Sequence, residues 1–161
     1  MTDAQFRRAM AQFATGVTVV TTLDSEGRNL GLTVNAFSSV SLDPPLILVC
    51  IDNRSETHAG FEASGLFGVS VLAEGQEEWS RRFALVGPEK FDGGGFLKGG
   101  TGVALLPGAL VHLECRVRAA YPGGDHTIYL GEIVSLSASP GRPLLYHGSV
   151  YGRLEGDTRG R

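Results

Sequence analysis

The chain has 161 residues, of which 42% are hydrophobic and 19% are charged, a composition that excludes a disordered or fibrous protein and fits a single folded domain. The formal net charge of −3 argues against a nucleic-acid-binding protein, because such proteins normally carry a basic face. Glycine accounts for 23 residues, about twice its usual share of roughly 7%, which favours a turn-rich β fold over a helical bundle.

The N-terminal residues predict an amphipathic helix. Thr2 and Gln5 have the spacing of a capping box, in which the side chain of each residue accepts a hydrogen bond from the backbone amide of the other. Apolar residues then recur at helical spacing, and Gly16 is placed to end the helix. The apolar stripe consists of Phe6, Ala9, Met10 and Phe13.

Strands are predicted next. Residues 17–23 are β-branched, residues 24–27 form a turn, and a second strand starts at Asn29. Residues 31–51 read GLTVNAFSSVSLDPPLILVCI: apolar and polar residues alternate, a turn follows at DPP, and the wholly apolar end predicts a buried strand. The sheet therefore presents polar side chains beside apolar strands, which suits a planar heterocycle that needs several hydrogen bonds. These side chains are Thr33, Asn35, Ser38 and Ser39.

The second half of the chain adds two helices and further strands. One helix opens near residue 53 with Ser55 as its N-cap, and Gly60 or Gly65 limits its length. Residues 76–83 predict a short helix, and the glycine-dense residues 84–102 form a long excursion of the kind that is usually functional or mobile. Residues 109–121 alternate cleanly, with Cys115 and Tyr121 on the inward face and His112 and Glu114 on the wet face. The remaining strands are expected at residues 66–72, 126–136, 143–147 and 150–154.

These elements indicate a mainly β protein with about eight strands, three short helices and no regular βαβ alternation. An antiparallel barrel with Greek-key connections fits this pattern, and a Rossmann fold does not. We expect one domain over residues 1–154, without internal repeats, and a polar tail at residues 155–161.

The cysteines and the N-terminus bear on location and metals. Cys50 and Cys115 lie in apolar strand patterns, with no CxxC and no Cys/His pair at metal spacing. The first residues lack the pattern of a signal peptide, and no apolar run reaches the ~18 residues that span a bilayer. We expect buried, reduced cysteines, no metal, no membrane contact and a cytoplasmic location.

Common catalytic motifs are missing from the sequence, including GxGxxG after a strand, GxxxxGK[ST], GxSxG and HExxH. His126 stands at a hairpin corner, where an imidazole can be held at the mouth of a barrel, although a plain surface histidine fits equally well. A helix start at Arg54, Ser55 and Thr57 can bind phosphate through free amides, although a plain N-cap is the simpler interpretation. The other histidines, His58, His112 and His147, are expected to be structural or surface residues.

Four blocks of the sequence resemble a known family. They are FRRAMAQFATGVTVVTT (6–22), GLTVNAFSSVSLDPPLILVCI (31–51), GDHTIYLGEI (124–133) and PLLYHGSVYGRL (143–154). In order and spacing, over nearly the whole chain, they resemble the short-chain flavin reductases, the small reductase components of two-component flavin-dependent monooxygenases. The resemblance implies an FMN-binding split β-barrel that works as a homodimer, in agreement with the barrel predicted above.

The resemblance also implies roles for individual residues. Residues that line the flavin ring, partly through backbone groups, would be Thr33, Val34, Asn35, Ala36, Ser38 and Ser39. The ribityl chain and ring would be bordered by Cys50 and Ile51, and the phosphate contacted by Arg54, Ser55 and Thr57. Residues closing over the flavin would be Phe83, Lys90 and Phe91, and residues standing where the nicotinamide stacks would be His126 and Tyr151.

The implied reaction is the reduction of FMN or FAD by NADH or NADPH, through hydride transfer from the nicotinamide to flavin N5. The reduced flavin would pass by diffusion to a partner monooxygenase. Two alternatives on the same barrel are an FMN-dependent oxidase of a small substrate and a non-catalytic flavin carrier or sensor. The residues do not choose between the two flavins or the two nicotinamide cofactors, or identify the monooxygenase.

Overall fold

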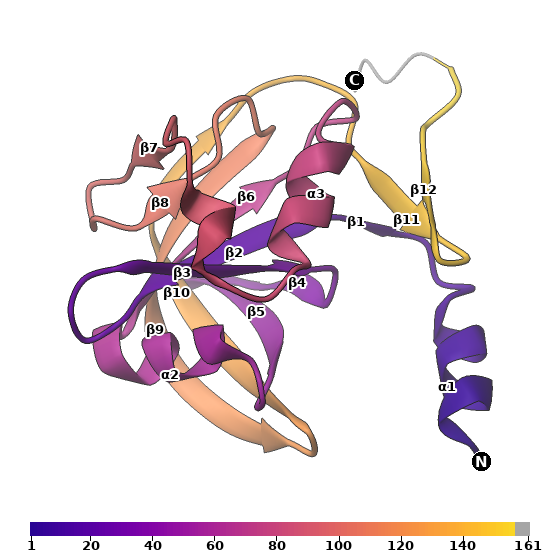
Figure 1. Cartoon of the computed structure of the whole chain (residues 1–161), viewed down its shortest axis with the longest axis horizontal. Coiled ribbons are helices and arrows are strands. Elements are labelled where there is room, and N and C mark those ends of the chain that lie inside the picture. The colour runs from indigo at the N-terminus through magenta and orange to yellow at the C-terminus, as the bar shows by residue number, and fades with distance from the viewer. Residues whose placement is uncertain (157–161) are drawn as a thin grey trace.

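The computed structural model describes residues 1–156, and its body is built from strands with short helices around it (Figure 1). Residues 157–161, most of the expected polar tail, lie outside the described part of the chain. The helices are α1 (Asp3–Met10), α2 (Glu56–Ser64) and α3 (Glu77–Phe83), and η1 (Pro88–Phe91) is a 3-10 turn. The strands are β1 (Thr15–Gly16), β2 (Thr18–Leu23), β3 (Asn29–Val34), β4 (Phe37–Leu42), β5 (Pro45–Asp52), β6 (Leu66–Val71), β7 (Leu97–Lys98), β8 (Ala104–Leu105), β9 (Val111–Gly123), β10 (His126–Ala138), β11 (Leu145–His147) and β12 (Val150–Gly152).

The main sheet is an antiparallel split barrel. Its seven strands run in the order β3-β2-β6-β9-β10-β5-β4, so β3 and β4 are its two edges. Only Asn35 and Ala36 separate these two edge strands in the sequence, and the sheet must therefore curl until its edges approach each other. Neighbours such as β2 with β6 are not consecutive in the chain, as expected for Greek-key connections. The predicted fold class is confirmed.

Two apolar clusters hold the barrel together. The first fills the interior with residues such as Val49 and Phe67, and α2 packs on it through Phe61, whose ring stacks on Tyr129 with 4.3 Å between centroids. The second cluster lies beneath α3 and includes the fully buried Phe83. Thus α2 and α3 cover the barrel where its side chains are apolar, and burial of apolar surface is the main stabilising contribution expected for such a domain.

A small second sheet lies outside the barrel. β1, β11 and β12 form it, and the turn between β11 and β12 is bound to the chain after α1 by the Gly148 amide, which donates to the Ala11 carbonyl at 2.8 Å. In Figure 1 this sheet and α1 stand to the side of the barrel. The capping box of α1 is present, with both Thr2–Gln5 hydrogen bonds formed.

The predicted extent of α1 was wrong. The helix ends at Met10, well before Gly16, so Phe13 lies beyond it. The predicted apolar stripe also buries nothing within the chain, since Phe6, Met10 and Phe13 are 50%, 55% and 76% exposed. Phe6, Ala9 and Met10 do lie on α1, but none of residues 1–156 buries this apolar face.

The alternation predicted for residues 109–121 fails at three positions. Glu114, expected on the wet face, is 5% exposed because the turn between β7 and β8 covers it. His112 is half-buried, with Nε2 2.6 Å from the Leu106 carbonyl oxygen. Tyr121, expected inside, is 54% exposed.

Several other expectations can be compared with the structure. The glycine-dense excursion contains η1 and a hairpin of β7 and β8. His58 in α2 has the contacts of a structural histidine, with Nε2 2.9 Å from the Thr127 hydroxyl. Both cysteines are free, but only Cys115 is buried, and its burial raises the thiol pKa to about 12. Within residues 1–156, no helix has the length and apolar character to cross a membrane, and no three His, Cys, Asp or Glu side chains cluster as metal ligands would.

Candidate active site

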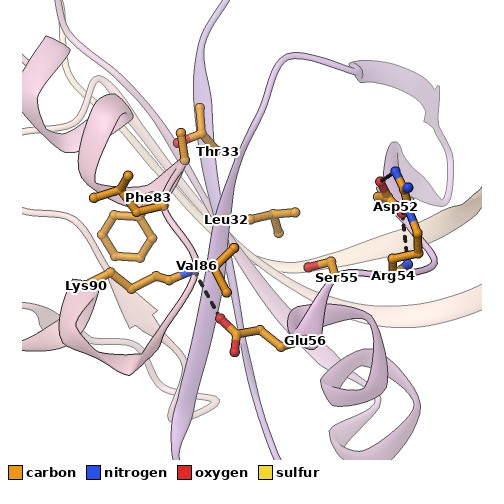
Figure 2. Close-up of a pocket in the computed structure, with 11 residues that line it drawn as sticks. Leu32, Thr33, Asp52, Arg54, Ser55, Glu56, Phe83, Val86 and Lys90 are labelled. Atoms are coloured by element: carbon orange, nitrogen blue, oxygen red, sulfur yellow. Dashed lines mark hydrogen bonds and ion pairs between the residues drawn. The ribbon is translucent and has the colours of Figure 1, made fainter.

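A pocket of about 570 Å³ opens at the start of α2, and we call it the α2 pocket (Figure 2). Its walls come from β3, from the end of β5 and the start of α2, and from the segment that follows α3. Five of the residues predicted for the flavin site line it, namely Thr33, Arg54, Ser55, Phe83 and Lys90. The structure therefore brings together residues that are 57 positions apart in the sequence, from Thr33 to Lys90.

Arg54 lies at the mouth of the α2 pocket and is paired with Asp52. The guanidinium Nη2 donates to Asp52 Oδ2 at 2.9 Å, and the Arg54 backbone amide donates to Asp52 Oδ1 at 2.8 Å. These hydrogen bonds hold the pKa of the Asp52 carboxyl well below its usual range. Asp52 is therefore a carboxylate at neutral pH.

Lys90 reaches the same pocket from η1 and is 7% exposed. Its Nζ donates to the Gly31 carbonyl at 2.9 Å and lies 3.5 Å from Glu56 Oε1. The same Glu56 oxygen accepts a bond from the Gly87 amide at 3.1 Å. Glu56 thus fixes the segment after α3 to the start of α2.

Ser55 is the N-cap of α2, as predicted, and its hydroxyl accepts a bond from the Thr57 amide at 3.1 Å. Thr57 itself is fully buried, and its hydroxyl has no hydrogen-bond partner among the described residues. Thr57 is not among the residues that line the α2 pocket, so the structure does not present its hydroxyl to a phosphate there.

Phe83 and Phe91 belong to an aromatic cluster with their ring centroids 5.1 Å apart, edge to face. Phe83 is fully buried and forms the floor of the α2 pocket, while Phe91 packs against the second cluster from η1. Contacts within the aromatic cluster hold these two rings in place.

A second concavity of about 790 Å³ lies beside the link between β3 and β4, and we call it the β3–β4 groove. Four predicted ring-binding residues line it: Asn35, Ala36, Ser38 and Cys50. Their apolar neighbours include Met10 and Phe13, which approach from α1 and the residues after it. The groove combines an apolar bed with an amide and a hydroxyl.

Other predicted ring-binding residues lie differently. The side chains of Val34 and Ile51 are in the barrel core, so only their backbone groups can face a ligand. Ser39 is exposed on β4 and is not among the residues lining the groove. The Thr33 hydroxyl donates to the Ser80 carbonyl at 2.6 Å, which occupies its proton with a structural bond.

His126 starts β10 at the tip of the long β9–β10 hairpin. Its Nδ1 lies 2.8 Å from Asp125 Oδ1, and it stands opposite Asp52 in the pairing of β10 with β5. A cavity of about 510 Å³ separates it from the residues of α1. Cys50 lines both this cavity and the β3–β4 groove, so His126 adjoins the groove.

Tyr151 is on β12, where its hydroxyl lies 2.8 Å from Ser80 Oγ and its ring is covered by Arg81 at 4.9 Å from the centroid. His126 lines the cavity that faces α1, whereas Tyr151 lines a separate cavity together with Arg81 and Tyr146. The two residues line different cavities of the chain, and their common role at one nicotinamide stays a prediction.

Sequence reasoning missed Asp52, Glu56, Ser80 and Arg81, which contact the predicted residues. A signal existed for two of them: Asp52 and Glu56 flank the helix start that carried Arg54 and Ser55. Ser80 and Arg81 gave no such signal, because their contact with Tyr151 spans about 70 residues and depends on the fold.

The donors around these concavities fit a flavin. Guanidinium, ammonium and hydroxyl groups at the α2 pocket are the groups that bind phosphate, and the groove offers the apolar bed and polar rim that a tricyclic ring needs. Both volumes lie within the roughly 300–1,000 Å³ of typical ligand pockets. Fold and pockets together define a flavin-binding split barrel.

Comparison with known proteins agrees with this class. The flavin reductase like domain matches residues 10–155, and the chain belongs to that family. An NADH-dependent FAD reductase from Streptomyces globisporus is 43% identical over 160 residues, which cover 96% of this chain and 87% of the relative. An NADH-dependent flavin reductase from a Rhodococcus species is 43% identical over 157 residues, covering 96% and 88%.

Solved structures of related proteins have the same fold. The NADH:FAD oxidoreductase of Streptomyces globisporus C-1027, in complex with NAD and FAD fragments, has a TM-score of 0.90 at 41% identity and covers 96% of this chain and 94% of its own. The flavin reductase component of a bacterial two-component tryptophan halogenase has a TM-score of 0.88 at 36% identity, with 97% and 100% covered.

Proposed function

We propose that the protein is an NADH-dependent flavin reductase that supplies reduced flavin to a partner monooxygenase. The observation that carries this proposal is the match over nearly the whole chain to relatives named as NADH-dependent FAD and flavin reductases. The α2 pocket and the β3–β4 groove support it, because one offers phosphate donors and the other a bed for a planar ring, and residues only two positions apart in the chain line them: Thr33 and Asp52 line the pocket, Asn35 and Cys50 the groove. A further relative is named as the reductase subunit of a flavin-dependent monooxygenase.

The chain's own residues have binding and positioning tasks in this reaction. Arg54, Ser55 and Lys90 hold the phosphate, while Asn35 and Ser38 hydrogen-bond the ring in the groove. When bound, the flavin supplies a hydride acceptor at N5. The protein contributes proximity, by holding the rings in contact, and excludes water from between them.

His126 positions the nicotinamide and is not required as a proton donor, because hydride transfer itself moves no proton to or from the protein. Because His126 and Tyr151 line different cavities of one chain, we infer that two copies of the chain bring them to the same nicotinamide. This separation, and the exposed apolar stripe on and after α1, support the proposal of a homodimer.

One assay separates this function from its rivals. The purified protein with excess free FMN and NADH is expected to consume NADH over many turnovers, whereas a carrier or sensor would consume at most one equivalent. An oxidase would reduce its flavin with a small substrate instead of NADH. Repeating the assay with FAD and with NADPH identifies the preferred pair, and His126→Ala is expected to raise KM for NADH while turnover continues.

The same assay can contradict the proposal. If no combination of flavin and nicotinamide gives more than a single turnover, the protein is not a reductase. If His126→Ala abolishes flavin reduction while NADH still binds, the positioning role of His126 is wrong.

A further inference from the structure

The α2 pocket contains two basic and two acidic side chains, and each cation already has a carboxylate partner. Arg54 is bonded to Asp52 at 2.9 Å, and Lys90 Nζ lies 3.5 Å from Glu56. In Figure 2 the two pairs lie on opposite sides of Ser55, the N-cap of α2. The formal charge of these four side chains therefore sums to zero at neutral pH.

This balance matters for any phosphate that enters the pocket. A phosphate monoester carries roughly −1.5 to −2 charges at pH 7, so it is repelled by carboxylates that stand beside its cationic donors. A pocket that retains phosphate tightly would present its arginine and lysine without competing anions. Here the ligand must share both cations with carboxylates of the protein.

Both carboxylates are held in place by bonds beyond their ion pairs. Asp52 also accepts a hydrogen bond from the Arg54 backbone amide at 2.8 Å, and Glu56 accepts one from the Gly87 amide at 3.1 Å. Their side chains are only 31% and 43% exposed, respectively, which limits their freedom to swing away. The negative charge therefore stays at the pocket when a ligand arrives.

We propose that Asp52 and Glu56 weaken the hold of the α2 pocket on the flavin phosphate, so that flavin exchanges as a substrate instead of remaining as a prosthetic group. This inference rests on the proposed function and adds to it the residues that set flavin release. Each carboxylate opposes the phosphate by a similar amount, because each one neutralises one of the two cations.

The test uses the isosteric variants Asp52→Asn and Glu56→Gln in the full chain. Both variants keep one oxygen that can accept the backbone amide bond and remove the negative charge; Asp52→Asn also replaces the oxygen that accepts from Arg54 Nη2 by an amide NH2. The dissociation constants of FMN and of riboflavin are measured by quenching of flavin fluorescence. The FMN constant is expected to fall about three-fold in each variant, the size of effect typical of partly exposed charges, while that of riboflavin, which has no phosphate, stays unchanged.

Two further measurements sharpen the test. The FMN affinity of the variants is expected to depend more strongly on salt than that of the wild type, because uncompensated cations now face the phosphate. Asp24→Asn is the matched control, because it changes the net charge by the same amount at a site away from the pocket. Asp24 pairs with Arg28 at 2.7 Å in the turn after β2 and does not line the α2 pocket. Its FMN constant should equal that of the wild type.

The outcomes are distinct. The inference is overturned if the dissociation constant of FMN is unchanged in both variants, or if that of riboflavin falls as much as that of FMN. In either case NADH turnover by the wild type would leave the proposed function intact. If the wild type neither binds flavin nor consumes NADH beyond one equivalent, the proposed function fails and this inference fails with it.

Discussion

At the scale of single residues, Ser80 links three parts of the fold. Its carbonyl accepts the Thr33 hydroxyl at 2.6 Å, and its own hydroxyl, fully buried, lies 2.8 Å from the Tyr151 hydroxyl. Tyr151→Phe leaves the buried Ser80 hydroxyl without this partner, and we expect a loss of about 1–3 kcal/mol in the free energy of unfolding. Ser80→Ala leaves only the half-buried Tyr151 hydroxyl, which water can reach, and should cost about 0.5–1.5 kcal/mol.

Urea unfolding of the two single variants and the double variant measures this coupling. The double variant is expected to resemble Ser80→Ala, since it contains no buried unpaired hydroxyl. Strictly additive losses would show that the two hydroxyls do not interact.

Glu114 is a second residue whose surroundings set its chemistry. Its burial acts to raise the pKa, but hydrogen bonds from Thr101 and Gly100 outweigh this effect and leave the pKa below its ordinary value of 4.5. A carboxyl with a lowered folded pKa stabilises the fold above its unfolded pKa, and that contribution disappears as the pH falls through the folded value. Glu114→Gln is therefore expected to cost about 1–3 kcal/mol at pH 7, and progressively less below pH 4.5.

The free energy of unfolding of wild type and Glu114→Gln, measured at neutral and at acid pH, checks this expectation. A gap between the two proteins that stays constant down to pH about 3 would mean that packing, and not ionisation, accounts for the loss.

At the scale of elements, α2 shows how two glycines of one helix differ. Gly65 ends the helix with a φ of +64°, whereas Gly60 lies inside it against the hairpin of β2 and β3. A Cβ at Gly60 would stand 2.6 Å from Thr22 Cγ2 and 3.1 Å from the Leu23 carbonyl oxygen. Gly60→Ala should thus destabilise the protein by about 1–3 kcal/mol through overpacking, although alanine favours helices.

Thermal and urea unfolding test this, with Ala59→Gly as a control for helix propensity at the exposed neighbouring position. The control should cost about 1 kcal/mol. A Gly60→Ala protein as stable as the wild type, or more stable, would show that α2 can move away from the hairpin without loss.

The elements also show what the sequence could predict. Local signals were sufficient for the capping box of α1, for Ser55 as the N-cap of α2, and for the turn that joins β2 to β3. Glu114 was misplaced because its burial comes from the β7–β8 turn, a contact distant in the chain. The sequence left Gly60 and Gly65 as alternative ends of α2, and the structure shows that Gly65 ends it. Periodicity describes which face of an element is apolar, but not which other element covers it.

At the scale of the whole molecule, those predicted site residues that line a concavity divide among four of them. Asn35 lies in the β3–β4 groove, Arg54 in the α2 pocket, His126 in the cavity facing α1, and Tyr151 in a small cavity beside Arg81. A family resemblance supplied the residues, but their grouping depends on how the barrel curls. The ion pair of Asp52 with Arg54 is local in the sequence, whereas that of Glu56 with Lys90 joins residues 34 positions apart and depends on the fold.

The apolar stripe of Phe6, Met10 and Phe13 gives the last prediction, which concerns assembly. These side chains are half or more exposed in the single chain, and apolar surface of this kind is normally covered by a partner. In a homodimer, light scattering would give twice the single-chain mass of 17.0 kDa. Phe13→Ser should shift that mass toward the monomer and lower flavin reduction together with it, whereas Leu97→Ser, on the exposed strand β7, should leave both unchanged. A wild type of single-chain mass at every concentration tested, with full NADH turnover, would refute the dimer and leave His126 and Tyr151 in separate sites.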